Sequence, residues 1–171
     1  MGAYRVDFDR MPESNLTVAF EGLRARGIDV TTLADVRRLD PQYLQKFHEL
    51  YTAAREGWPD PDPDPSGSIP VPLEQIQSWL EPARGPEAFF IARDNGRYVA
   101  FTSFAIGTAV HPDYRRQGIA TLLKAGSIAD AQTRGLTGQT TSTASVGMRK
   151  VLEKLGYRRT WSEIRLICEL H

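Results

Sequence analysis

Apolar residues recur along the chain with two different periods, and these periods predict its helices and strands. A helical spacing of apolar residues predicts helices over residues 16–26, 41–56, 73–80, 119–135 and 146–155. Alternating or β-branched runs predict strands over residues 4–8, 28–33, 88–92, 97–104, 106–111, 140–143, 157–161 and 163–169. The Asn95-Gly96 pair predicts the turn of a hairpin. This order of elements predicts an α/β fold in which helices flank a mixed central β-sheet.

Individual residues mark where some of these elements begin and end. Asp40 can cap the helix that follows it, with a proline at the first helical position, and Gly156 is placed to end the helix before it. Alternating prolines over residues 57–67 exclude helix and ladder pairing there, which predicts an exposed acidic loop. Only Ala105 separates two successive predicted strands, although the tightest common hairpins use a two-residue turn. We expect this shortened connection to narrow or reshape the surface beside the two strands.

Length and composition fit one compact globular domain, which we assign to residues 27–171, with residues 1–26 as an extension. The 21 basic and 21 acidic residues give a formal net charge of zero, so neither nucleic acid nor an anionic membrane is expected as a partner. No apolar run approaches the roughly 20 residues of a membrane span, and no secretory signal is visible. The single cysteine, Cys168, cannot form an internal disulfide. A cytoplasmic location is therefore expected.

The segment 110–120, V-H-P-D-Y-R-R-Q-G-I-A, joins a predicted strand to the start of a predicted helix. Helix starts carry N–H groups without intrahelical acceptors and favour anions. Gly118 lets the backbone approach a phosphate closely, and Ala120 keeps the first turn slim. Arg115 and Arg116 add guanidinium groups, whose bonds to phosphate contribute about 1.5–3 kcal/mol each. On spacing alone, a strand–helix turn with solvated arginines is an equally good interpretation.

Two motifs make the interpretation more specific. The run R-R-Q-G-I-A at residues 115–120 matches every fixed position of [QR]-x-x-G-x-[GA], the hallmark of the GNAT superfamily of N-acetyltransferases, which this sequence resembles. The run E-K-L-G-Y at residues 153–157 resembles the second signature of that family. The resemblance covers residues 88–170 and is compatible with residues 28–87 as the first strand and two helices of the family. It implies a GNAT fold.

The resemblance also implies a cofactor site. Acyl-CoA, here acetyl-CoA as co-substrate, would lie in a V-shaped cleft where the strands 106–111 and 140–143 splay apart. The backbone of Ala109 and Val110 would pair with the pantetheine arm. Arg115 belongs to the motif, and the backbone amides that would hold the pyrophosphate are those of Arg116, Gln117, Gly118, Ile119, Ala120 and Thr121. The primary amine of a small molecule or peptide would attack the thioester directly.

The sequence departs from the family pattern at two positions of the second signature helix. Ser145 stands where many members carry an asparagine that touches the CoA arm; the serine can still bond there, but we favour it as the N-cap of helix 146–155. Leu152 stands where many members carry a tyrosine that protonates the CoA thiolate. Water or another group would then have to supply that proton. Catalytic residues stay unassigned, and the alternative function is a non-catalytic acyl-CoA-binding or regulatory module.

Other residues carry weaker hypotheses. His111 is a candidate base unless it faces away from the acceptor, and we favour core or edge-of-core positions for His48, Tyr157 and Cys168. Three scattered histidines suggest no metal site. An acidic lip for a cationic amine is one interpretation of the loop residues Glu56, Trp58 and Asp60; a solvated proline-rich loop is the other. Residues 1–33 resemble the inter-domain stretch of tandem GNAT proteins, which raises the hypothesis of a duplicated pair, and a homodimer is a further possibility.

Overall fold

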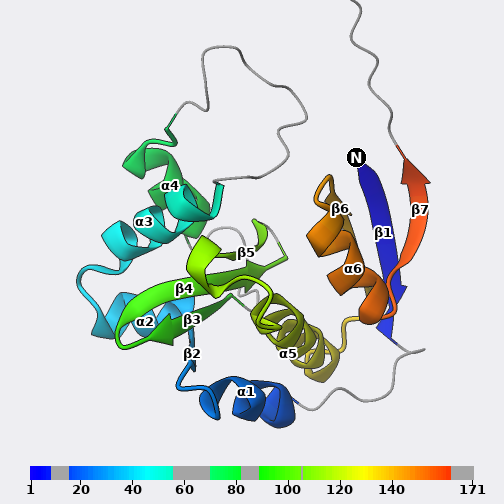
Figure 1. Ribbon diagram of the computed structural model, residues 1–171, viewed down its shortest axis with the longest axis horizontal. Helices are drawn as coiled ribbons and strands as arrows, with labels where there is room; N and C mark the ends of the chain where they lie inside the picture. The colour runs from blue at the N-terminus through cyan, green and yellow to red at the C-terminus, as the bar shows by residue number, and fades with distance from the viewer. Residues whose placement is uncertain (9–15, 56–69, 82–88, 105, 163–171) are drawn as a thin grey trace, which may run out of the picture.

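The computed structural model of the chain describes residues 1–8, 16–55, 70–81, 89–104 and 106–162. The strands there are β1 (Gly2–Asp7), β2 (Asp29–Thr32), β3 (Phe90–Asp94), β4 (Arg97–Ser103), β5 (Gly107–Val110), β6 (Gly138–Thr143) and β7 (Arg158–Ser162). The helices are α1 (Leu16–Arg24), α2 (Leu33–Leu39), α3 (Tyr43–Arg55), α4 (Leu73–Leu80), α5 (Ile119–Thr133) and α6 (Val146–Lys154). The predicted α/β fold is confirmed (Figure 1), but the described strands form two antiparallel sheets and not the single mixed sheet that was predicted. The strand predicted over 163–169 lies outside the described residues.

Four strands form an antiparallel sheet in the order β2-β3-β4-β5. The predicted hairpin between β3 and β4 is confirmed. Its turn residues Asn95 and Gly96 have φ values of 47° and 81°, and a type I′ hairpin turn requires positive φ at both positions. Asn-Gly is thus the pair that specifies this turn.

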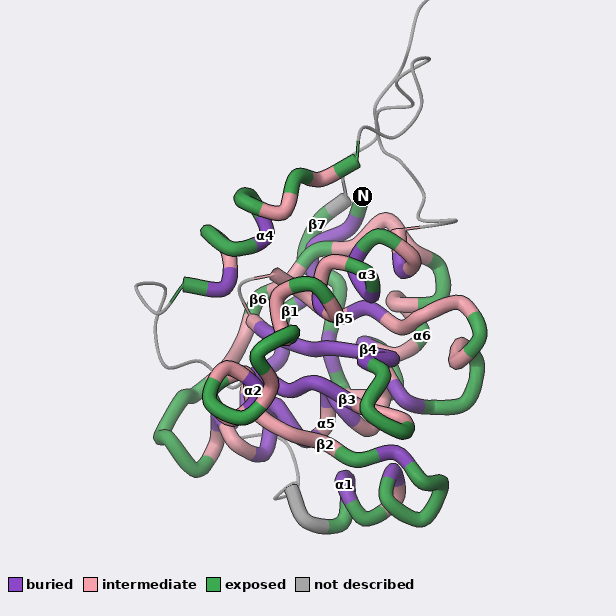
Figure 2. The backbone as a smooth tube through the Cα atoms, turned by 90° about the vertical axis from the view of Figure 1, so that its left-hand side faces the viewer, coloured by how far each residue is buried: buried purple, intermediate pink, exposed green. Residues whose placement is uncertain are grey.

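Helices cover both faces of this first sheet. On one face α2, α3 and α4 pack on the strands, in a core that includes Phe47, Ile76 and Phe101. On the other face α1 and α5 pack, in a core that includes Leu23 and Leu123. Figure 2 shows β3 and β4 as the buried centre between these helices. Burial on both faces explains why these strands are almost continuously apolar.

The β-branched run over 28–33 is not one strand, and α2 was not predicted. β2 ends at Thr32, whose hydroxyl accepts a hydrogen bond from the backbone N–H of Asp35 at 3.1 Å. Such a threonine cap begins a helix, so Leu33 opens α2 instead of extending the strand. The Asp40 carboxylate accepts a hydrogen bond from the Gln42 backbone N–H at 3.0 Å. α3 nevertheless begins at Tyr43, two positions later than predicted, and Asp40 is the C-cap of α2.

The connection between β4 and β5 corrects the predicted shortening. β4 ends at Ser103 and β5 begins at Gly107, and these two residues pair directly, so residues 104–106 connect the strands. The Ser103 hydroxyl accepts a hydrogen bond from the Ile106 backbone N–H at 2.8 Å. Gly107 has a φ of 108°, which residues with a Cβ rarely adopt. The hairpin is of ordinary length because β4 and β5 are each shorter than the apolar pattern suggests.

Three further strands form a second antiparallel sheet in the order β6-β1-β7. The central strand is β1, so residues 1–26, assigned above to an extension, supply the middle of this sheet. Tyr4 and Val6 of β1 share a buried core with Ile128 of α5 and Leu152 of α6. α1 in turn packs along α5. Both elements of the extension are therefore packed into the fold.

α5 joins the two sheets (Figure 1). Ile119 and Leu123, early in the helix, pack in the core of the first sheet, whereas Ile128 and Ala131 pack in the core of the second. β5 and β6, the strands expected to splay, belong to different sheets and are not paired with each other. Each therefore has one edge without a ladder partner among the described strands.

Candidate functional site

A pocket of about 560 Å³ lies between β5 and β6, bounded by the start of α5 and one face of α6. Its lining combines segments that are far apart in sequence. Nine of the ten residues predicted to bind the cofactor line it, and Gln117 is the one outside the lining: Ala109, Val110, Arg115, Arg116, Gly118, Ile119, Ala120, Thr121 and Ser145. The fold thus brings the predicted site together, while their contact with a cofactor stays a prediction.

The turn before α5 has an unusual backbone. A short 3-10 helix, Pro112–Tyr114, follows β5, and then Arg116 and Gly118 have φ values of 60° and 79°. Gly118 directly precedes α5 as its N-cap. A residue with a Cβ is strained in this left-handed conformation, whereas glycine adopts it freely. The glycine therefore sets the direction in which the first N–H groups of α5 face the pocket, an arrangement that favours an anion.

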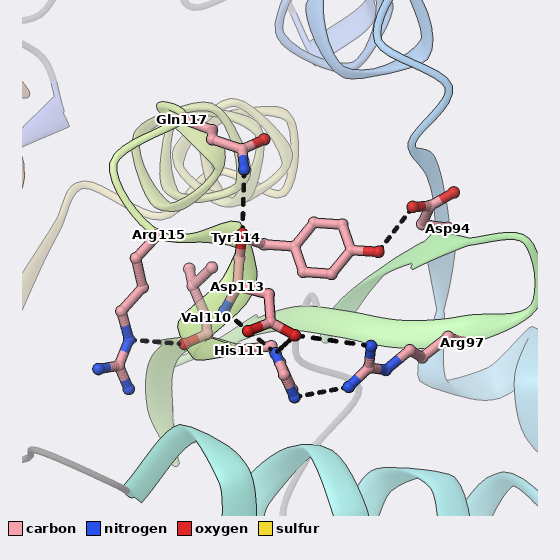
Figure 3. A network of polar contacts seen from close by, with 8 residues as sticks. All are labelled: Asp94, Arg97, Val110, His111, Asp113, Tyr114, Arg115 and Gln117. Atoms are coloured by element: carbon pink, nitrogen blue, oxygen red, sulfur yellow. Dashed lines mark hydrogen bonds and ion pairs between the residues drawn. The ribbon is translucent and has the colours of Figure 1, made fainter.

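Two side chains hold the turn in place. Arg26, just after α1, donates a hydrogen bond to the Gln117 carbonyl oxygen. Gln117 itself donates from Nε2 to the Asp113 carbonyl oxygen at 3.2 Å (Figure 3). The side chain and the carbonyl of Gln117 thus both brace the turn, which leaves its backbone N–H as the group that can face a ligand. Arg26 was not predicted here, because no sequence motif connects it to the turn.

The two arginines of the motif have different surroundings. Arg115 donates from Nε to the Val110 carbonyl oxygen at 3.2 Å and from Nη2 to the Ala54 carbonyl oxygen at 2.8 Å. It therefore ties the turn to β5 (Figure 3) and to the end of α3. Arg116 is exposed and lines the pocket, and no described residue bonds its guanidinium. Arg116 is the better placed of the two to reach a phosphate.

His111 belongs to a polar network on the turn and is absent from the pocket lining. Its Nε2 lies 2.7 Å from Nη2 of Arg97. Its Nδ1 accepts a hydrogen bond from the Asp113 backbone N–H at 3.3 Å and lies 3.5 Å from the Asp113 carboxylate (Figure 3). Tyr114 donates to the Asp94 carboxylate at 2.7 Å, and this bond raises the pKa of the phenol. These contacts give His111 a structural role and leave it poorly placed as a base.

The free edge of β5 presents backbone groups to the pocket. The His111 backbone N–H donates to the Val99 carbonyl of β4 at 2.8 Å. Backbone groups of successive strand residues point to opposite edges, so Val110 and Thr108 direct theirs away from β4. Both residues line the pocket. The pantetheine contact of Val110 stays a prediction, Thr108 is a new candidate, and Ala109 directs its own amide toward β4.

Ser145 and Leu152, the two residues at α6 that depart from the family pattern, both line the pocket. Ser145 caps the helix, since its hydroxyl accepts a hydrogen bond from the Met148 backbone N–H at 3.3 Å. The predicted cap is confirmed, and Ser145 also lines the pocket. Leu152 is 1% exposed and contributes an apolar side chain to the pocket lining. No proton donor therefore stands at the position where the family often has a tyrosine.

The pocket contains one residue that the sequence patterns did not single out. Lys124 of α5 is 2% exposed and lines the pocket. Its Nζ lies 5.0 Å from the centroid of the Phe104 ring, and burial lowers its pKa to about 8. The sequence spacing could have identified this lysine. Lys124 follows Ala120 by four residues and precedes Ile128 by four, so it lies on the same helix face as these two apolar residues.

The remaining candidates lie away from the pocket or outside the described residues. His48 lies 2.8 Å from the Val71 carbonyl oxygen through Nε2 and bridges α3 to the segment before α4. Tyr157 is 3% exposed in the second core, as predicted. Glu56, Trp58, Asp60 and Cys168 lie outside the described residues. Among the described residues no group of side chains could hold a metal ion, and no helix is long and apolar enough to cross a membrane.

The sequence profile of the acetyltransferase (GNAT) family matches residues 44–157. That range includes the whole turn, α5, β6 and α6. No curated protein is significantly similar to the chain in sequence.

Solved structures share this fold at low identity. A GCN5-related N-acetyltransferase from Sphaerobacter thermophilus is similar at a TM-score of 0.62 and 14% identity, over 93% of this chain and 48% of that one. The ribosomal-protein-S18-alanine N-acetyltransferase from Escherichia coli is similar at 0.53 and 17%, over 78% and 79%. AAC(6')-Iy, in complex with the bisubstrate analogue CoA-S-monomethyl-acetylneamine, is similar at 0.50 and 20%, over 84% and 99%. This chain thus spans about half of the Sphaerobacter chain.

Proposed function

This chain belongs to the acetyltransferase (GNAT) family, and on that premise we propose that it transfers an acetyl group from acetyl-CoA to a primary amine of a small molecule or peptide. The observation that carries the proposal is the pocket between β5 and β6, which begins at the Gly118 turn. This pocket combines an anion-favouring helix start with a strand edge able to pair with an amide-bearing arm.

The residues that line the pocket suit the pyrophosphate, the pantetheine arm and the thioester of acetyl-CoA in turn. The pyrophosphate lies at the first N–H groups of α5, with the exposed Arg116 guanidinium beside it. The pantetheine amides pair with the backbone N–H of Val110, whose carbonyl already accepts from Arg115, and with the backbone groups of Thr108. The amine then attacks the thioester carbonyl carbon, and the carbon–sulfur bond breaks. Positioning within the pocket supplies much of the rate enhancement.

A second candidate, a non-catalytic acyl-CoA-binding module, is favoured by Leu152, which offers no proton to the leaving thiolate. In addition, the described lining contains no carboxylate and no histidine that could accept the proton of the amine. A panel of amines in a thiol-release assay separates the candidates. Turnover with any amine supports the transferase, whereas CoA binding without turnover across the panel supports the binding module.

Replacing Gly118 by leucine tests the placement of the pyrophosphate. The leucine is strained at a φ of 79°, so the turn must change its path. We expect the dissociation constant for CoA, measured by calorimetry, to rise at least about tenfold. Gly96→Leu is the matched control, since Gly96 has a φ of 81° in a hairpin turn outside the pocket lining. Equal CoA affinities of the two variants would refute the placement.

A further inference from the structure

Lys124 brings a positive charge into the pocket, and no described residue pairs with that charge. The residues that line the pocket from β5, β6 and α6 are all uncharged. The other titratable lining residues are Tyr114, Arg115 and Arg116, and all three belong to the turn. A buried ammonium without a counter-ion is costly. Its presence in a ligand pocket therefore points to a negative charge that arrives with, or develops on, the ligand.

The ammonium lies at the end of the pocket remote from the turn. Phe104, whose ring centroid is 5.0 Å from Nζ, follows β4 and lies beside the beginning of β5. The chain leaves β5 for the Gly118 turn after Val110, at the other end of the strand. The four residues of β5 separate these two ends by about 10 Å. Nζ is thus far from the place that favours phosphate.

Under the proposed function, on which this inference rests, the pyrophosphate occupies the turn and the pantetheine arm follows β5 away from it, so the sulfur lies toward Phe104. We infer that Lys124 is the catalytic acid that protonates the departing CoA thiolate. The acceptor nitrogen bonds to the carbonyl carbon, the carbon–sulfur bond breaks, and the sulfur takes a proton from Nζ. The acceptor nitrogen loses one proton to water, and water returns one to Nζ.

Two neighbouring residues and the burial of Lys124 itself agree with this role. Leu152 lines the same pocket without a donor, so the proton has to come from another side chain or from water. The Phe104 ring stabilises the ammonium while leaving its N–H groups free to donate. Burial lowers the pKa of Lys124 to about 8, which lets it carry the proton at neutral pH and release it more readily than an exposed lysine does.

The test needs no knowledge of the acceptor. CoA is bound to the full chain and its thiol is titrated by the ultraviolet absorbance of the thiolate. We expect the wild type to lower the thiol pKa of bound CoA by at least about one unit, which raises the thiolate fraction about tenfold at a given pH. Lys124→Met, which keeps the side-chain volume but removes the charge, should abolish that shift. Lys150→Met is the matched control, because Lys150 is exposed on α6 outside the lining.

A second measurement shows that the variant pocket is intact. Lys124→Met and wild type should bind desulfo-CoA, which lacks the sulfur, with the same dissociation constant by calorimetry. Equal thiol pKa values in wild type and Lys124→Met, with CoA bound to both, would overturn the inference and leave the proposed function standing. Failure of the wild type to bind CoA would overturn both.

Discussion

At the scale of single residues, Lys124 shows how burial links a site to stability. Because the folded-state pKa of about 8 is below the ordinary value of 10.5, the unfolded chain binds this proton more tightly. Stability should therefore rise with pH between about 8 and 10.5, and the ammonium costs about 3 kcal/mol below that window. We expect Lys124→Met to raise the free energy of unfolding at pH 7 and to remove this rise. Urea unfolding at several pH values measures both effects.

The control for that prediction is again Lys150→Met on the exposed face of α6. It should leave the dependence of the unfolding free energy on pH between 8 and 10 as in wild type. The same pH dependence in Lys124→Met and wild type would mean that the ammonium is hydrated in the folded chain, which would contradict the predicted cost of burying it.

Residues with a local signature were predicted well, and residues whose role depends on distant partners were not. Gly118 and Ser145 were placed correctly at helix starts, because capping and left-handed turns are encoded within a few positions. Arg115 was expected to face phosphate, yet its guanidinium bonds the carbonyl of Ala54 on α3. Arg26 braces the turn from after α1. Only the folded arrangement brings those residues together.

At the scale of elements, α1 and α5 approach each other at Gly126. A Cβ at this position would overlap the ring of Phe20, which is buried and in edge-to-face contact with Phe90 at 5.0 Å between centroids. We expect Gly126→Ala to lower the free energy of unfolding by about 1–3 kcal/mol through overpacking, although alanine favours a helix. Thermal or urea unfolding measures the loss.

Gly22→Ala on α1 is the matched control for this contact. A Cβ at Gly22 would lie 3.5 Å from Cδ1 of Leu122, an ordinary contact distance. The higher helix propensity of alanine should then leave stability unchanged or raise it by up to about 1 kcal/mol. A loss of stability for Gly22→Ala equal to that for Gly126→Ala would contradict the close approach at Phe20.

Element prediction succeeded where one pattern covered a whole segment and failed where two patterns overlapped. The helix now seen as α3 has apolar residues on a single helical face and was recognised from them. At Thr32 a β-branched run and a helix cap coincide, and the predicted strand rested on the run alone. A threonine followed three residues later by Asp35 was the cue that competed with it.

At the scale of the whole molecule, β1 connects the start of the described chain to the wall of the pocket. β6 lines the pocket and pairs with β1. A Cβ at Gly138 would lie 2.6 Å from the Val6 carbonyl oxygen, a backbone atom that cannot move without moving β1. We expect Gly138→Ala to destabilise the second sheet and to weaken CoA binding, although neither Gly138 nor Val6 lines the pocket. Hydrogen exchange of the β1 amides and calorimetry with CoA measure the two effects.

Thr140→Ala, at an exposed position of the same strand, is the control for that variant. It changes one β-branched side chain without affecting the close backbone approach, so CoA affinity should stay within about twofold of wild type. Faster exchange of the β1 amides in Gly138→Ala with unchanged CoA affinity would show that the pocket wall does not depend on β1.

The central place of β1 was beyond sequence prediction. The strand itself was recognised from its alternation, but pairing partners of a strand depend on the whole chain, and Tyr4 pairs with Thr141 on one side and Arg159 on the other. No local pattern distinguishes such a strand from an extension. The four-stranded sheet, by contrast, follows mostly from neighbours in sequence.

This difference between the sheets has a consequence for the order of folding during synthesis. The first sheet needs only residues up to 110, so it can form while later residues are still being translated. β1 is made first of the described strands but has no partner until β6 and β7 have left the ribosome. Until then Tyr4 and Val6 are exposed, and long loop closure makes their pairing a late, slow step. A nascent chain of which residues up to about 136 have left the ribosome should therefore protect β3 and β4 from hydrogen exchange while β1 exchanges freely.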